Sequence, residues 1–228
     1  MNNLLRLLRQ VRAFVFRNIR PAPDISDLKP MSRKFGFDRG KPIDRVYIEK
    51  FLKRNTKSIR GNVLEINTDA YTKKYGAEKV TNIDILDIDS NNKSATIIGD
   101  LRDLSSIKDN TYDSLLITQT FGVIDEYQKA VLECHRILKP GGVLLATVSA
   151  MAPLHQRSSS YWRFNPLGAK YAFSKVFGAN NVTISEFGNF HTGLAFWMGM
   201  AAEDIDEKVF DKKDPEYPFI LGIKAIKK

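Results

Sequence analysis

The chain has 228 residues, a length that fits one domain with an appendage. Hydrophobic residues make up 43% of it, enough for one large core, so an intrinsically disordered chain is excluded. The single cysteine, Cys134, excludes a disulfide framework and a cysteine-rich zinc site, and it favours a reducing compartment such as the cytoplasm. Because no apolar run approaches the ~18 residues of a membrane-spanning helix, we do not expect a transmembrane protein.

The positive charge is concentrated at the N-terminus. Residues 1–60 hold 16 Lys/Arg against 5 Asp/Glu, whereas the remaining 168 residues hold 19 against 21. A basic arm of this kind also fits nucleic-acid binding, but the arm carries no recognised nucleic-acid motif. We therefore expect no nucleic-acid partner.

Residues 3–19 predict an amphipathic helix, with leucines, valines and a phenylalanine on one side and five arginines on the other. Two prolines, Pro21 and Pro23, end it and begin a linker to about residue 30. An acid-free helix with this pattern is typical of a segment lying in a membrane interface. The same apolar stripe could instead dock on the domain, on a second copy or on another protein. We expect a helix and linker over 1–30 and a domain over 31–228.

The rest of the chain alternates short apolar runs with segments of helical period. Strands are predicted at 63–66, 80–84, 95–98, 114–118, 143–148, 182–187 and 219–226. Helices are predicted at 43–55, 125–138, 166–176 and 193–204, with a breaker at 139–142. This alternation predicts an α/β fold, a mostly parallel sheet with an antiparallel edge strand and helices on both faces.

In such a sheet, ligands bind outside the carboxyl ends of the strands. Asp84 closes the predicted second strand, 19 residues after Glu65, where dinucleotide-type folds place a carboxylate on ribose hydroxyls. Two acceptor oxygens match a vicinal diol. The alternative is that Asp84 caps a turn, as aspartate often does.

Several motifs then resemble the class I S-adenosylmethionine-dependent methyltransferases. They are VLEI at 63–66, Asp84, GDL at 99–101, YDSLL at 112–116 and HRILKPGG at 135–142, the last being the most specific. Further segments look like a bacterial subgroup associated with glycosyltransferases and surface-glycan assembly: FGFDRG at 35–40, PIDR at 42–45 and YWRF at 161–164. The resemblance implies a Rossmann-like methyltransferase fold with a seven-stranded sheet, and S-adenosylmethionine as cofactor. It implies no metal.

The resemblance also implies residue roles on the cofactor side. Glu65 and Asn67 belong to the first cofactor loop, and Asp84 would hold the ribose diol. Ile85 and Leu101 would pack on the adenine, Asp100 would accept from its exocyclic amine, and Gln119 would lie near the sulfonium.

In the family that the motifs resemble, glycines in the first loop let the backbone approach the methionine half of the cofactor; residues 65–71 of this chain lack them. Asn67 tolerates a positive φ better than most residues, so we interpret the loop as a subgroup variant. A second interpretation is a methyltransferase-like protein without activity that binds a glycosyltransferase.

On the acceptor side, the expected function is O-methylation of a saccharide or other small molecule in surface-polysaccharide biosynthesis. His155, in the loop after the fifth strand, is the candidate general base. Arg39, Tyr161, Trp162 and Arg163 are the candidate acceptor-binding residues, because aromatic rings suit sugars and arginine suits anionic groups. We expect a small-molecule or glycan acceptor, a glycosyltransferase as a possible partner, and peripheral membrane contact through residues 1–20.

Overall fold

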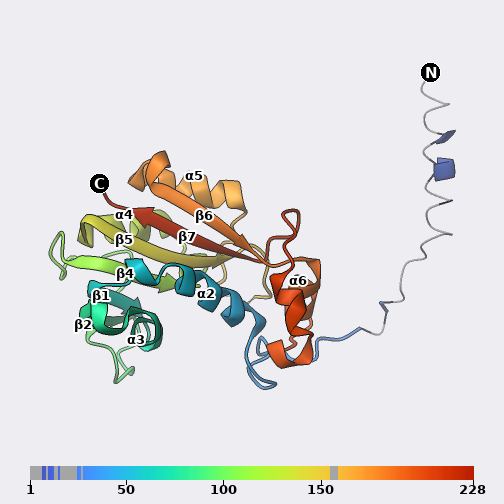
Figure 1. Cartoon of the computed structure of the whole chain (residues 1–228), viewed down its shortest axis with the longest axis horizontal. Helices are drawn as coiled ribbons and strands as arrows, with labels where there is room; N and C mark the ends of the chain where they lie inside the picture. The colour runs from blue at the N-terminus through green and yellow to red at the C-terminus, as the bar shows by residue number, and fades with distance from the viewer. Residues whose placement is uncertain (1–6, 9, 13–14, 16–24, 27, 155–158) are drawn as a thin grey trace. The chain divides into compact units, whose positions relative to one another are not determined.

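The structure is a computed structural model that describes residues 7–8, 10–12, 15, 25–26, 28–154 and 159–228. The chain divides into two units, Met1–Pro30 and Met31–Lys228 (Figure 1). Much of the predicted helix over 3–19 lies outside the described residues, but those described between 7 and 15 are helical, and their apolar side chains are exposed. No helix in the described ranges is long and apolar enough to cross a membrane.

The second unit is built on one seven-stranded sheet. Its strands are β1 (Gly61–Ile66), β2 (Val80–Asp87), β3 (Ile97–Ile98), β4 (Tyr112–Thr118), β5 (Leu138–Ser149), β6 (Val182–Phe187) and β7 (Ile220–Ile226). The order is β3-β2-β1-β4-β5-β7-β6, and the pairs are parallel except where β7 runs antiparallel between β5 and β6. This is the Rossmann-like methyltransferase arrangement, so the predicted fold class is confirmed.

Helices cover both faces of this sheet. They are α2 (Ile43–Arg54), α3 (Ala70–Gly76), α4 (Tyr127–Ile137), α5 (Pro166–Phe177) and α6 (Phe190–Trp197). Successive side chains of a strand point to opposite faces, so Leu115 and Ile117 of β4 join the core under α4 and α5, whereas Leu116 joins the core under α2 and α6. Figure 1 shows α5 on one side of the sheet and α2 and α3 on the other.

Three predicted boundaries are wrong. The second strand extends to Asp87, three residues beyond Asp84. The fifth begins at Leu138, so the predicted breaker lies inside it; a shift in register and a positive φ of 78° at Gly141 accommodate that segment. The helix expected to reach residue 204 ends at Trp197, because Gly199 turns the chain at φ 72° against the backbone of Ser32.

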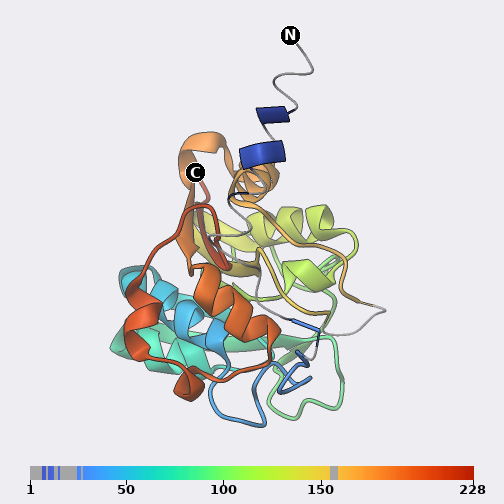
Figure 2. The ribbon, with the colours of Figure 1, turned by 90° about the vertical axis from the view of Figure 1, so that its right-hand side faces the viewer.

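Residues 31–42 pack against the segment that follows α6. Met31 N–H donates to Met198 O (2.7 Å), and Ala202 N–H donates to Lys41 O (2.7 Å). Figure 2 shows this blue segment beside the red chain after α6. The two regions are far apart in sequence, so these contacts fix the start of α2 in place.

Candidate active site

A cavity of about 280 Å³ lies at the carboxyl ends of β1, β2 and β4. Its lining residues are Ile66, Leu86, Asp87, Ile88, Gly99, Asp100, Leu101, Arg102, Thr120, Val123, Ile124, Asp125, Ser159 and Tyr161. The lining combines aliphatic side chains with three carboxylates from separate segments: Asp87 ends β2, Asp100 follows β3 and Asp125 lies in the loop after β4. Such a site can stack a flat ring between apolar walls and accept hydrogen bonds from hydroxyl and amino groups.

The glycine-poor loop after β1 is held by a side chain from another loop. Asn67 adopts φ 67°, in the left-handed region that asparagine tolerates better than most residues. Asn92 Nδ2 donates to Asn67 O (2.8 Å) and to Asp87 Oδ2 (2.7 Å). Asn92 therefore connects the loop to the end of β2, where Asp87 lines the cavity.

Glu65 supports this loop by binding the first turn of the helix that follows it. Its carboxylate accepts from the N–H groups of Tyr71 (3.1 Å) and Thr72 (2.7 Å) in the first turn of α3. The side chain is buried, and burial raises its pKa. Glu65 does not line the cavity, so the structure gives it a supporting position behind the loop, although the resemblance placed it among the cofactor-binding residues.

Asp84 and Ile85 lie inside β2 and not at its end. Asp84 accepts from Tyr112 Oη (2.9 Å) and Thr96 Oγ1 (3.1 Å), and Ile85 is buried in the sheet. Neither residue lines the cavity; Asp87 and Ile88, three positions further on, do. The expectation that Asp84 closes the strand is therefore wrong. The signal that could have corrected it is the polar run of residues 89–94, which begins only after Asp87 and Ile88.

Asp100 and Leu101 both line the cavity. Arg102 donates to Asp100 (2.6 Å) and to Asp125 (2.7 Å), which lines the cavity from the loop after β4. The hydrogen bonds from Arg102 hold the pKa of Asp100 below its usual range, so this carboxylate is an acceptor. Sequence reasoning found Asp100 and Leu101 but missed Arg102 and Asp125.

Gln119 follows β4 with a strained backbone. Its φ is 54°, and its N–H donates to Thr147 O (2.8 Å). Gln119 Oε1 accepts from Ser149 Oγ (2.9 Å), whereas Nε2 is buried without a hydrogen-bond partner among the residues that the structure describes. Strain and an unsatisfied buried donor beside Thr120 of the cavity wall are features of ligand sites.

The predicted acceptor residues separate into different positions. Tyr161 lines the cavity and exposes 52% of its surface. Arg163 donates to the carbonyl oxygens of Trp162 and Pro153, each at 2.9 Å. Arg39 forms a bidentate ion pair with Asp204, both bonds at 2.8 Å, which fastens residues 31–42 to the segment after α6. The candidate base, His155, lies outside the described residues.

Trp162 anchors the wall of the cavity from outside. Its indole N–H donates to the carbonyl oxygens of Ile124 (2.9 Å) and Asp125 (3.0 Å), and its ring contacts Tyr127 edge to face. Ile124 and Asp125 both line the cavity, whereas Trp162 does not.

Replacing Trp162 with alanine should therefore weaken S-adenosylhomocysteine binding about threefold to tenfold, because residues 124–125 lose their anchor. A Trp162→Phe variant keeps an aromatic ring but lacks the indole N–H donor, so its affinity should lie between those of wild type and the alanine variant. Isothermal titration checks this, and an alanine variant that binds the ligand as wild type does would show that the anchor is dispensable.

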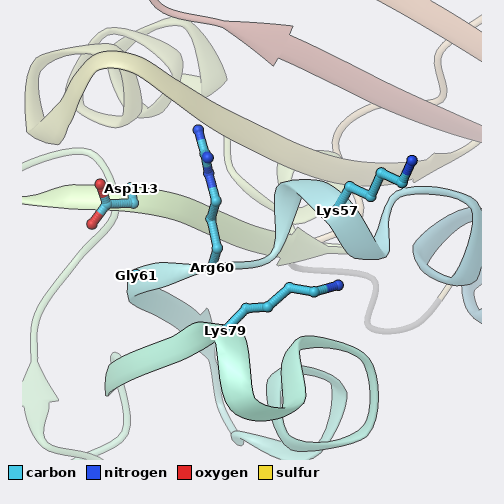
Figure 3. A pocket seen from close by; sticks show the side chains of 5 residues that line it. All are labelled: Lys57, Arg60, Gly61, Lys79 and Asp113. Carbon is cyan, nitrogen blue, oxygen red and sulfur yellow. The ribbon is translucent and has the colours of Figure 1, made fainter.

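A larger cavity, of about 610 Å³, lies at the opposite end of the sheet. It is lined by Lys57, Arg60, Gly61, Lys79 and Asp113. Figure 3 shows Lys57 and Lys79 pointing away from Asp113, whose carboxylate accepts from Lys139 (2.7 Å). Because it lies at the amino ends of β1 and β4, this cavity is separate from the candidate active site.

Part of the chain matches a known family model. Residues 52–146 match the family model described as a methyltransferase domain. No curated protein matches the chain.

Solved structures of low sequence identity share the fold. A SAM-dependent methyltransferase from Archaeoglobus fulgidus is 17% identical, with 80% of this chain and 94% of that chain covered at a TM-score of 0.56. A Haloferax volcanii protein in complex with the Trm112 methyltransferase activator is 18% identical, with coverage of 81% and 92% and a TM-score of 0.52. The cyclase SpnF is 14% identical, with coverage of 87% and 88% and a TM-score of 0.54. Since a cyclase shares it, this fold alone does not fix the reaction.

A methyltransferase-domain match over residues 52–146 and a fold shared with a SAM-dependent methyltransferase make S-adenosylmethionine the cofactor to compare with this site. The residues present fit the adenosine part of that cofactor: aliphatic walls enclose a slot, and Asp87 and Asp100 supply acceptors. Gln119, which the resemblance placed near the sulfonium, is not among the lining residues, although the next residue, Thr120, is. The glycosyltransferase-associated subgroup is outside what these comparisons show.

Proposed function

We propose that the enzyme methylates a hydroxyl group of a saccharide or similar small acceptor in surface-glycan biosynthesis. The observation that carries this proposal is the cavity at the carboxyl edge, which combines cofactor-type acceptors with an exposed aromatic ring, Tyr161. An aromatic face packs against the apolar face of a sugar ring. The resemblance of residues 35–45 and 161–164 to the glycosyltransferase-associated subgroup supports the same acceptor class.

The protein's part in the reaction is positioning. When bound, S-adenosylmethionine supplies a methyl group activated by its sulfonium. In our proposal, Asp87 accepts from the ribose hydroxyls and Asp100 from the adenine amine, which fixes the cofactor in the slot. Asp87, in this proposal, takes the role that the resemblance gave to Asp84. His155, the candidate base chosen from the sequence, removes the proton from the acceptor hydroxyl; Ser159, four residues later in the chain, lines the cavity.

The test is a methyl-transfer assay with S-adenosylmethionine and three acceptor panels: saccharides, carboxylic acids and amines. Methylation of a saccharide that His155→Ala reduces strongly, without loss of cofactor affinity, would support both proposals. Transfer only to a carboxylic acid or an amine would contradict the saccharide assignment. Binding of neither S-adenosylmethionine nor S-adenosylhomocysteine in calorimetry would favour the alternative, a methyltransferase-like protein that acts as a binding partner of a glycosyltransferase.

We also propose that residues 1–20 attach the enzyme peripherally to a membrane. Leu7, Leu8, Val11 and Val15 are exposed apolar residues of the helical segment, and arginines occupy the other side of the predicted helix. Each basic residue near an anionic leaflet contributes about 1 kcal/mol, and burial of the apolar face adds to it.

Co-sedimentation with anionic vesicles tests this proposal. We expect the full-length protein to bind, a variant lacking residues 1–22 to stay in the supernatant, and salt to weaken binding. A full-length protein that does not sediment at low salt would assign the helix to a protein interface.

A further inference from the structure

The first turn of α2 contains a buried carboxylate that is only partly compensated: the N–H groups of Asp44 and Arg45 and the charge of Arg45 act on it, but one oxygen has no partner in the described chain. Asp44 exposes only 9% of its surface, and its Oδ1 atom has no hydrogen-bond partner among the described residues. Burying a carboxylate costs free energy unless a cation or a donor compensates it. The neighbouring Arg45 is the cation that acts on it, and burial nevertheless raises the pKa of Asp44. A ligand that brings a positive charge to Oδ1 would remove this cost.

The position of α2 puts this carboxylate toward the carboxyl edge of the sheet, the edge at which the cofactor slot lies; Asp44 and Arg45 are not themselves among the residues that line the slot. Ile48 and Phe51 of α2 join the same core as Leu116 of β4. Asp44 precedes Ile48 by one helical turn on the buried side of α2. In Figure 1, α2 begins near the carboxyl end of β5 and runs back toward its amino end. Asp44 therefore lies toward the carboxyl ends of the parallel strands.

Contacts through Tyr71 connect this turn to the glycine-poor loop. Arg45 Nη1 lies 3.5 Å from Tyr71 Oη, and the charges of both Asp44 and Arg45 act on that hydroxyl. Tyr71 in turn donates its N–H to Glu65, so it stands directly after the loop that begins at Asn67. Arg45 is also held 5.9 Å from the ring of Phe37. The adjacent carboxylate and guanidinium thus border the loop that the resemblance assigns to the methionine half of the cofactor.

We propose that Asp44 and Arg45 bind the amino-acid end of the cofactor, Asp44 accepting from its α-ammonium group and Arg45 pairing with its α-carboxylate. A side-by-side carboxylate and guanidinium are complementary to a zwitterion. In this site the pair replaces contacts that a glycine-rich loop would make through its backbone. The inference rests on the proposed function, because it takes S-adenosylmethionine as the ligand of the neighbouring slot.

Calorimetry with two ligands tests this inference. S-Adenosylhomocysteine carries the amino-acid end, whereas 5′-methylthioadenosine has the same adenosine and thioether without it. We expect Asp44→Asn to weaken S-adenosylhomocysteine binding tenfold or more and to leave 5′-methylthioadenosine binding unchanged. Arg45→Gln should give the same pattern. The matched control is Glu49→Gln, a carboxylate of the same helix that pairs with Lys41 (2.8 Å) and Lys74 (3.1 Å) and should change neither affinity.

The possible outcomes distinguish failure of this amino-acid site from failure of the proposed function. If wild type binds both ligands and both variants keep full affinity for S-adenosylhomocysteine, the amino-acid site is wrong while the proposed function stands. Equal losses for both ligands would give these residues a structural role and overturn the inference too. If wild type binds neither ligand, the proposed function itself fails. The Asp44→Asn variant should melt no lower than wild type, because the substitution removes a buried charge while the side chain keeps nearly the same size.

Discussion

Replacing Asp87 with alanine should weaken S-adenosylhomocysteine binding by about 10- to 150-fold, as expected from loss of charge-assisted hydrogen bonds worth about 1.5–3 kcal/mol. Asp87 lines the cavity at the end of β2, and its carboxylate can accept from both hydroxyls of a ribose. Its side chain is outside both cores but accepts from Asn92 Nδ2 and Asp89 N–H, so the melting temperature should fall only modestly. Calorimetry and a thermal melt measure the two quantities.

Asp84→Asn is the matched control for this prediction. Asp84 accepts from the buried Tyr112, so its amide variant should lower the melting temperature while nearly preserving affinity. The opposite pattern, with affinity lost in the Asp84 variant and retained in the Asp87 variant, would restore the ribose role that the resemblance gave to Asp84.

Arg136→Ala should lower the free energy of unfolding by on the order of 3 kcal/mol. The guanidinium of Arg136 donates to Glu133 and Asp109 and to the carbonyl oxygens of Leu104 and Ile107, all at 2.7–2.9 Å. Its removal leaves two carbonyls of the loop after β3 without their donor, and hydrogen bonds to charged groups are each worth about 1.5–3 kcal/mol. Chemical denaturation measures the loss.

An exposed ion pair on the same helix supplies the comparison. Lys129 pairs with Glu126 at 2.8 Å, but both side chains are more than half exposed, so Lys129→Ala should change stability by less than about 0.5 kcal/mol. Equal effects of the two substitutions would show that the Arg136 network adds nothing beyond a surface charge pair.

The fold could be predicted from the sequence because its elements obey local rules. Buried strands such as 63–66 and 114–118 are short, mostly apolar runs, and the helix 43–54 has a clear apolar stripe. The failures lie where tertiary contacts override local signals. Gly141 and its neighbours look like a loop, yet they form hydrogen bonds with Lys227 at the end of the sheet. Gly199 ends a helix whose composition alone would have allowed it to continue.

The site could be predicted only in part, because a motif locates site residues correctly only where the end of the strand is also predicted correctly. Asp100 and Leu101 directly follow the short β3, so their placement in the cavity survives small errors in boundary. The second strand carries acids at 84, 87 and 89, and the apolar pattern does not distinguish which of them lies at its end. Arg102 and Asn92 could not be foreseen, since each acts through partners in other loops.

The loop after β1 also has a consequence for the entropy of ligand binding. A glycine-rich loop samples many backbone conformations, and fixing it around a ligand costs conformational entropy. Here an asparagine occupies the left-handed conformation at position 67, and Asn92 already holds its carbonyl. The unliganded loop is restricted before any ligand arrives, so less ordering remains to be done on binding. With Asn67 in place of the usual glycine, the loop thus has less backbone freedom but is already close to its ligand-binding conformation.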